Sequence, residues 1–279
     1  QRQMCIRDRR EGVKDFAAAA ERIFEFNKKI VDTLYDVVPS VKVQIAYYEM
    51  YGVPGMKAFE ETLKYAAEKG LIVIADAKRN DIGSTAACYS KAFLGNTDLN
   101  GNALRAFPAD YLTVNGYLGT DGIQPFAQDC SERNKGIFVL VKTSNPSSGE
   151  LQNLLLENGL PVYEYMGGLV EKWGESTVGR YGYSAVGAVV GATHPEEAAR
   201  LRKVLPHTFF LIPGYGAQGA NAQMLKCCFK EDGLGGVVNN SRGILCAYKK
   251  NGGSYFDAAR AAAVAMQKDL SEVIGRMGK

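Results

Sequence analysis

The sequence has few residues of the kinds that bind metals or form disulfides. It contains two histidines and six cysteines. No two cysteines form a C-x-x-C pair, and their spacing is unlike that of a small secreted scaffold, which favours free thiols in a reducing compartment. The cysteines are Cys5, Cys88, Cys130, Cys227, Cys228 and Cys246. We therefore expect no metal site and a cytoplasmic protein.

Long apolar runs and blocks of one charge are also missing. The stretch SAVGAVVGA (184–192) is too short and too rich in glycine to cross a bilayer, and the start of the chain does not resemble a signal peptide. The net charge is +3, with Lys and Arg scattered among Asp and Glu. This pattern gives little support for a nucleic-acid partner or a membrane surface. The content of 46% hydrophobic and 23% charged residues is ordinary for a soluble domain with a sizeable core.

Short apolar runs alternate with longer amphipathic patterns along the chain. The predicted strands are 41–46, 71–76, 110–114, 136–142, 184–190, 208–212 and 235–240, and the clearest predicted helices are 16–38, 55–70 and 193–205. Continuously apolar strands that alternate with helices indicate a parallel sheet covered by helices. The fold class is therefore α/β, either a barrel or a doubly wound sheet.

A (β/α)₈ TIM barrel needs eight strands, and the pattern supplies seven. Residues 1–10, QRQMCIRDRR, are charged and have no convincing strand pattern. This segment is either a foreign or truncated start or an atypical strand. We expect residues 11–279 to form a single barrel domain that lacks its first strand.

Both histidines are expected to be structural. Thr193 and Glu196 match a T-x-x-E capping box with Pro195 in the first turn, so His194 is expected to begin a helix rather than bind a ligand. His207 has no acidic or cysteine partner nearby in the sequence.

Charged residues cluster where the second predicted strand ends, in LIVIADAKRNDIGST (71–85). Asp76 and Lys78 are two residues apart and are expected to project to the same side of the strand, with Asp81 in the following loop. A Lys between two carboxylates stays protonated and can act as an oriented proton donor. The alternative is a structural ion-pair network, with Asp81 or Ser84 capping the next helix. The carboxyl end of a barrel strand favours the catalytic interpretation.

A second lysine, Lys42, lies within the preceding predicted strand, VKVQIA. A Lys among buried residues needs a partner, and Asp76 is the natural one. Lys42, Asp76, Lys78 and Asp81 would then alternate in charge. The alternative is a Lys that reaches solvent from the strand edge.

Two loops near the C-terminus have features of a phosphate site. In LIPGYGAQGAN (211–221), three glycines match G-x-G-x-x-G, but the motif lies too late in the chain for a dinucleotide fold and lacks the expected acidic residue. A phosphate cradle that includes Gln218 fits better. Arg242 and Gly243 follow the last strand, where Arg can clamp a phosphate. An ordinary turn with a surface Arg is the alternative.

The loop KTSNPSSGE (142–150) follows the predicted strand 136–142 and is rich in small polar residues. Its hydroxyl and amide groups could contact the edge of a planar ring, and the long connection to a helix at 161 could act as a lid. A plain turn is the alternative.

With these motifs in place, the sequence resembles the orotidine 5′-monophosphate decarboxylase family, in its bacterial branch with longer insertions. The D-x-K-x-x-D-I signature stands at residues 76–82, and the likeness runs from FNKKIVD (26–32) through VKVQIAYYE, LVKTSNP, VVGATHPEE and IPGYGAQG to NNSRGI. The resemblance implies a TIM barrel that converts orotidine 5′-monophosphate (OMP) to UMP in pyrimidine biosynthesis without a cofactor.

The resemblance also implies a role for each matching residue. Lys78 would protonate C6 of the pyrimidine, Asp76 and Asp81 would hold Lys78 beside the substrate carboxylate, and Lys42 would bind the ribose. Asp81 and Thr85 would come from the second subunit of a homodimer. The implied pyrimidine contact is Ser144, and the implied phosphate contacts are Gln218, Arg242 and Gly243.

Two other interpretations remain open. The family's first strand ends in a Gly-Leu-Asp-Pro-like segment that is missing here, so the chain could be an inactive nucleotide-binding barrel. Related sugar-phosphate decarboxylases share the D-x-K-x-x-D signature, but they place an acidic residue for Mg²⁺ where this chain has Lys42, which would repel a cation.

Overall fold

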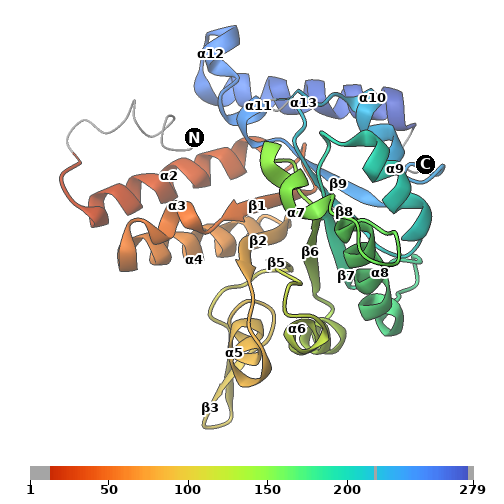
Figure 1. Cartoon of the computed structure of the whole chain (residues 1–279). Coiled ribbons are helices and arrows are strands. Elements are labelled where there is room, and N and C mark those ends of the chain that lie inside the picture. The colour runs from red at the N-terminus through yellow and green to blue at the C-terminus, as the bar shows by residue number, and fades with distance from the viewer. Residues whose placement is uncertain (1–12, 217–218, 276–279) are drawn as a thin grey trace. The chain divides into compact units, whose positions relative to one another are not determined.

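The computed structural model describes residues 13–216 and 219–275, and seven strands form its main sheet. Their order is β1-β2-β5-β6-β7-β8-β9 (Figure 1). The strands are β1 (Ser40–Gln44), β2 (Ile72–Arg79), β5 (Tyr111–Val114), β6 (Gly136–Lys142), β7 (Val186–Val190), β8 (Phe210–Pro213) and β9 (Gly236–Asn239). All seven predicted strands are confirmed, and β2 runs three residues further than predicted, so that it contains Lys78.

Four pairs of neighbouring strands run parallel, as the alternation of strands and helices predicts. The pairs β1–β2, β6–β7, β7–β8 and β8–β9 are each parallel. In the first pair, Gln44 lies opposite Asp76. Parallel pairing thus brings Gln44 beside Asp76 within the first unit.

The chain divides into two compact units. The first comprises Gln1–Ala77, Ala92–Leu112 and Ser241–Gln267, and the second comprises Lys78–Lys91, Thr113–Asn240 and Lys268–Lys279.

The helices of the first unit differ in how many side chains they bury. They are α2 (Phe16–Leu34), α3 (Ala46–Glu49), α4 (Gly52–Glu68), α11 (Ser241–Leu245), α12 (Tyr248–Asn251) and α13 (Tyr255–Ile274), the last of which ends in the second unit. Helix α2 begins where the Asp15 carboxylate accepts a hydrogen bond from Ala18 N–H at 2.8 Å. Its buried Asn27 donates to Tyr48 Oη at 2.7 Å and to Thr62 Oγ1 at 3.1 Å, which joins α2 to α3 and α4.

Aromatic side chains form the centre of the first unit. Phe59 packs edge-on against Tyr48 and Phe107, with ring centroids 5.3 and 5.6 Å apart, and Phe93 stacks on Phe107 at 5.0 Å. Tyr48, Phe59 and Phe93 are almost completely buried. Offset and edge-on ring pairs add to the free energy gained from burial.

The second unit contains the remaining helices, except for the last two residues of one of them, Ala92 and Phe93. These helices are α5 (Gly83–Phe93), α6 (Thr120–Arg133), η1 (Pro146–Ser148), α7 (Gly149–Gln152), α8 (Val162–Gly174), η2 (Glu175–Thr177), α9 (Pro195–Val204), α10 (Ala222–Leu225) and η3 (Lys226–Cys228). The buried guanidinium of Arg202 donates to Thr208 O at 2.9 Å and to Leu205 O, and lies 4.0 Å from the centre of the Phe210 ring. Arg202 thereby fixes the connection from α9 to β8.

A short hairpin that the sequence analysis did not predict joins β3 (Thr97–Leu99) to β4 (Asn102–Leu104). Asn100 and Gly101 form its turn with φ angles of 55° and 86°. Two positive φ angles in succession are typical of the type I′ turn, for which Asn-Gly is a strong signal. The sequence therefore held the information that predicts this hairpin.

The prediction that Thr193 and Glu196 form a capping box is wrong. Helix α9 begins at Pro195, and its N-cap residue is His194, which forms no side-chain capping bond. The Thr193 hydroxyl instead donates to Ser144 O at 3.5 Å, so a tertiary contact replaces the local one. The prediction that His194 begins a helix is confirmed. His207 has a structural partner distant in sequence, since its Nδ1 lies 2.8 Å from Glu171 Oε1.

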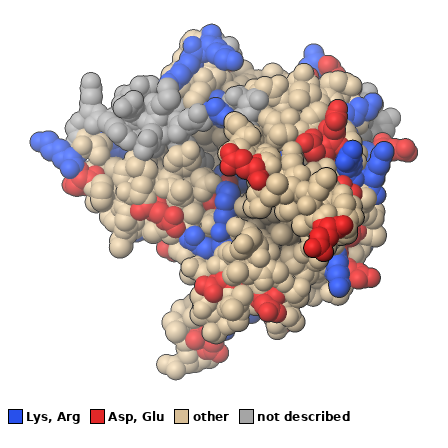
Figure 2. Space-filling model, in the orientation of Figure 1, with Lys and Arg blue, Asp and Glu red and all other residues tan. Residues whose placement is uncertain are grey.

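Other predictions concern the surface and the termini. Among the described residues, no helix is both long and apolar enough to cross a membrane. On the face shown in Figure 2, basic and acidic side chains are both present and lie in separate small groups. The five cysteines that the structure describes are free thiols. Residues 1–10, where we predicted an atypical start, lie outside the described residues.

Candidate functional site

A buried ion pair joins β1 to β2. Lys42 Nζ donates to Asp76 Oδ2, and the two side chains are 14% and 7% exposed. Gln44 Nε2 also donates to Asp76 Oδ2, at 3.0 Å. Two charges held out of water need close pairing and further hydrogen bonds, and this arrangement supplies both. The predicted partnership of Lys42 with Asp76 is confirmed, and the alternative of a Lys reaching into solvent is wrong.

Gln44 is a site residue that was not predicted, although the sequence carries a signal for it. Gln44 lies two residues after Lys42 on the same strand, and residues two apart share one face of a strand. It lies opposite Asp76 in the register of β1 and β2. Once Lys42 is a candidate site residue, this spacing also selects Gln44.

Lys78 has an unusual backbone conformation. Its φ angle is +48°, in the left-handed region that a residue with a long side chain rarely adopts. The other described non-glycine residues with positive φ are two asparagines, which tolerate this region better. Lys78 N–H donates to Thr113 Oγ1 at 3.0 Å, which supports the conformation. Strained backbone of this kind clusters at functional sites.

Because the backbone of Lys78 is left-handed, one prediction from the sequence does not apply to it. We expected Asp76 and Lys78 to project together because residues two apart in a strand share a face. That rule requires extended backbone, and Lys78 departs from it although β2 continues to Arg79. Local turn geometry therefore sets the direction of the Lys78 side chain.

Asp81 and Thr85 follow in the turn and in α5. Asp81 Oδ1 accepts a hydrogen bond from Ile82 N–H at 2.8 Å, before the helix begins at Gly83. An N-cap side chain bonds to the second or third residue of a helix, so this bond is not a cap. The Thr85 side chain lies in the first turn of α5 and is exposed.

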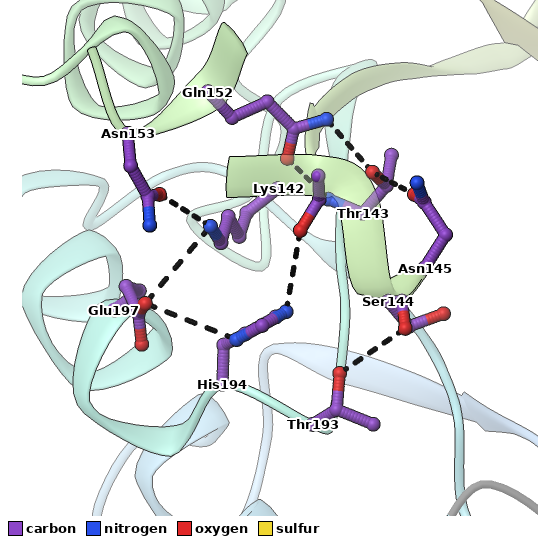
Figure 3. A network of polar contacts seen from close by, with 10 residues as sticks. Lys142, Thr143, Ser144, Asn145, Gln152, Asn153, Thr193, His194 and Glu197 are labelled. Atoms are coloured by element: carbon purple, nitrogen blue, oxygen red, sulfur yellow. Dashed lines mark hydrogen bonds and ion pairs between the residues drawn. The ribbon is translucent and has the colours of Figure 1, made fainter. Parts of the chain in front are cut away.

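Ser144 follows β6 and is held closely against the end of β7. Gly191 N–H donates to Lys142 O at 2.7 Å, and the Thr193 hydroxyl donates to Ser144 O (Figure 3). A Cβ atom on Gly191 would lie 2.9 Å from the backbone N, Cα and Cβ of Ser144. The loop can take this path because position 191 has no side chain.

Gly191→Ala is therefore expected to destabilise the fold. The added methyl group overlaps backbone atoms of Ser144, and such overpacking lowers the free energy of unfolding by about 1–3 kcal/mol. Urea denaturation measures this change. Gly168→Ala is the matched control, since a Cβ there meets no atom within 4 Å inside α8 and alanine favours a helix by about 0.5–1 kcal/mol. Equal stability of the two variants would contradict the close approach.

The glycine-rich loop after β8 forms a tight turn. Gly214, Gly216 and Gly219 have φ angles of 115°, 72° and 93°, which residues with side chains adopt at a cost. Gly216 N–H donates to Ala220 O at 2.7 Å, and Gly219 N–H donates to Gly216 O at 2.9 Å. These two N–H groups stabilise the turn itself, so a phosphate bound here would use other donors. Gln218, the predicted donor in this loop, lies outside the described residues.

Arg242 and Gly243 belong to α11, immediately after the loop that follows β9. Both residues are partly buried, and Arg242 O accepts a hydrogen bond from Cys246 N–H at 3.0 Å. Short helices that follow the late strands of a barrel are common positions for phosphate contacts.

In the first unit, Lys42 and Asp76 form the buried pair and Arg242 lies in α11. In the second unit lie Lys78, the loop of Ser144 and the glycine-rich loop after β8. Within the described ranges, no three His, Cys, Asp or Glu side chains come close enough together to hold a metal ion. The sequence profile of the orotidine 5′-phosphate decarboxylase / HUMPS family matches residues 19–250. The chain belongs to this family.

Known members of the decarboxylase family resemble the chain over most of its length. The orotidine 5′-phosphate decarboxylase of Clostridium acetobutylicum is 45% identical over 268 residues, which cover 95% of this chain and 90% of that protein. A crystal structure of a putative orotidine 5′-phosphate decarboxylase from Streptomyces avermitilis is 32% identical, with a TM-score of 0.76, and covers 93% of this chain and 84% of that one.

A more distant decarboxylase has the same fold. The enzyme from Methanocaldococcus jannaschii, complexed with the inhibitor BMP, is 20% identical, with a TM-score of 0.62, and covers 87% of this chain and 91% of that one. The architecture predicted from the sequence, a (β/α) barrel, is thus confirmed as that of the decarboxylase family.

Proposed function

We propose that this protein decarboxylates orotidine 5′-monophosphate to UMP. Its relatives are named for this decarboxylase activity. Family membership and 45% identity over almost the whole chain support the proposal. The observation that carries it is the D-x-K-x-x-D signature at the end of β2, where Lys78 occupies strained backbone. The carboxyl end of a barrel strand is the usual position of catalytic groups.

The proposed chemistry is a proton transfer coupled to loss of carbon dioxide. The bond between C6 and the carboxylate breaks, its electron pair stays on C6, and the Lys78 ammonium donates a proton there. The products are carbon dioxide and UMP, and the neutral amine regains its proton from water. The proposal requires no cofactor, because one ammonium supplies both the stabilising charge and the proton.

The remaining charged residues hold the Lys78 ammonium and the substrate in the arrangement that stabilises the transition state. Asp76 and Asp81 orient the ammonium and lie beside the substrate carboxylate, and Lys42 binds the ribose. A fixed charge acts more strongly on the developing carbanion than on the ground state because it needs no reorganisation during the reaction. The buried Lys42–Asp76 pair supports this role, since a pre-formed network is what such catalysis requires.

Contacts far from C6 supply binding energy. Ser144 contacts the pyrimidine, while Gln218, Arg242 and Gly243 hold the phosphate. Binding energy from the phosphate helps to organise the site around the reacting carbon.

The test is the absorbance change of orotidine 5′-monophosphate upon conversion to UMP. We expect rapid turnover of this substrate and far slower turnover of orotidine, which lacks the phosphate. No turnover of the phosphate form, with UMP still bound, would instead identify an inactive binding protein.

We further propose a homodimer with shared active sites. Ile82, Tyr117 and Leu118 are 52%, 77% and 44% exposed, and they belong to the same unit as Asp81 and Thr85. Gly122 at the start of α6 packs against Asp81 O, with its would-be Cβ at 3.1 Å, so the two loops that carry these residues are neighbours. Large exposed apolar side chains that lie together are typical of subunit interfaces.

Mixing two inactive variants tests the shared site. Lys78→Ala and Asp81→Ala are each expected to be inactive, but subunit exchange in a twofold dimer restores about a quarter of the sites, because one site of each mixed dimer has both native residues. Activity of the mixture and sedimentation velocity are measured together. A dimer that shows no recovery would place Asp81 in its own subunit's site.

We also place the protein in the cytoplasm, in agreement with its free thiols.

A further inference from the structure

A buried lysine that the proposed chemistry does not use lies at the end of β6. Lys142 is fully buried, and its Nζ donates to Asn153 Oδ1 at 2.6 Å. Glu197 Oε1 lies 3.9 Å from the same nitrogen, and the centre of the Tyr163 ring lies 5.3 Å away. Figure 3 shows the ammonium between the Asn153 and Glu197 side chains. Burial lowers the pKa of Lys142, and Glu197 opposes this shift.

The partner of Lys142 belongs to the segment between Ser144 and α8. Asn153 directly follows α7, and the adjacent Gln152 forms two hydrogen bonds with Thr143. Gln152 Oε1 accepts from Thr143 N–H at 3.0 Å, and Gln152 Nε2 donates to Thr143 Oγ1 at 2.7 Å. The segment therefore folds back, and its middle bonds to the two residues that precede Ser144.

Apolar burial contributes little to holding this segment. Leu151, Leu154, Leu155 and Leu160 are 55%, 54%, 73% and 37% exposed. Polar contacts to Lys142 and Thr143 thus attach a segment in which three of the five leucines are more than half exposed. A segment with few buried apolar contacts opens at low free energy, so the polar contacts decide how well it is ordered.

The choice of a lysine at this position also needs an explanation. A buried ammonium carries a desolvation cost that an apolar side chain of similar volume does not, and its partner Glu197, which is 25% exposed, would not be left as a buried unpaired charge. An apolar residue at the end of β6 would therefore serve the core at least as well, but it could not bond to Asn153.

We propose that Lys142 is a positioning residue that fixes the Ser144 loop through Asn153 and thereby sets the affinity for the pyrimidine. The proposal rests on the pyrimidine-binding role of Ser144 given above. Glu197 orients the ammonium from α9, and it also lies 3.8 Å from His194 Nδ1. His194 Nε2 is in turn 3.4 Å from the buried Ser148 hydroxyl, so the network contacts the same loop a second time.

Four single variants, and the double variant of Lys142→Met with Asn153→Leu, test this role. Lys142→Met removes the ammonium with little change in volume, Asn153→Leu removes the acceptor, and Asn153→Asp keeps it. Asn158→Leu is the matched control, because Asn158 lies in the same segment, is exposed, and accepts a hydrogen bond from Leu160 N–H within its own turn.

We expect Lys142→Met and Asn153→Leu to raise KM for orotidine 5′-monophosphate about 10-fold or more with a smaller change in kcat, because the lost contact acts on binding. The double variant is expected to lose no more than either single variant, since both remove one interaction. Asn153→Asp is expected to lose much less than Asn153→Leu. The melting temperature of Lys142→Met is expected to be unchanged or higher.

Hydrogen exchange of the ligand-free protein separates this proposal from the proposed function. Amide exchange in residues 143–156 is expected to be faster in Lys142→Met than in the wild type, and unchanged in Asn158→Leu. If Lys142→Met exchanges faster but the wild type has no decarboxylase activity, the loop contact is supported and only the proposed function is overturned. Native exchange and native KM in Lys142→Met, or a lowered melting temperature with native KM, would overturn the positioning role.

Discussion

Lys78→Ala is expected to reduce kcat for decarboxylation of orotidine 5′-monophosphate by ~10³-fold or more, because the ammonium acts both as proton donor and as the charge that stabilises the carbanion. Binding of UMP, which calorimetry measures, is expected to persist, since the proposed pyrimidine and phosphate contacts are on other loops. The variant therefore separates catalysis from binding.

Lys91→Ala is the matched control for this result. Lys91 is an exposed lysine in the last turn of α5 and has no proposed part in the reaction, so its loss is expected to leave kcat unchanged. Turnover near the wild-type rate in Lys78→Ala would exclude the mechanism, whereas loss of both turnover and UMP binding would indicate a folding defect.

Asp76→Ala is expected to reduce both stability and activity. The substitution leaves the Lys42 ammonium buried without its carboxylate, and breaking a buried pair in this way costs about 3–5 kcal/mol of unfolding free energy. Urea denaturation measures the loss of stability, and the absorbance assay measures the loss of turnover. Gln44 also loses the acceptor of its hydrogen bond.

A double variant separates the two effects of Asp76. Lys42→Met with Asp76→Leu removes both charges and replaces them with apolar side chains, so stability is expected to return to near the wild-type value. Activity is expected to remain lost because the charge network is absent. An active double variant would show that the pair is only structural, and a stable Asp76→Ala protein would show that Lys42 finds another partner.

The sequence was sufficient to predict the elements that repeat regularly. Apolar runs marked all seven strands, because a buried strand in a parallel sheet is apolar on both faces. The Lys42–Asp76 pair was also predictable, since a lysine within such a run needs a carboxylate on a neighbouring strand. In both cases a short stretch of sequence and one general rule were enough.

Features that depend on a tertiary contact for which the sequence pattern gives no signal could not be predicted. Thr193 matched a local capping pattern, but its hydroxyl bonds to Ser144 O, 49 residues earlier. The left-handed backbone of Lys78 depends on Thr113 from another strand, and nothing in the residue type favours it. Lys142 was visible as a lysine that ends an apolar run, but only the fold brings Asn153 to it.

The backbone of Lys78 sets a limit on engineering this enzyme for heat resistance. A left-handed φ at a lysine costs roughly 1 kcal/mol or more that glycine would not incur. Lys78→Gly should therefore relieve strain while it removes the proposed proton donor. A selection for thermal stability alone would favour such inactive proteins, so a screen at this position needs turnover as a second criterion.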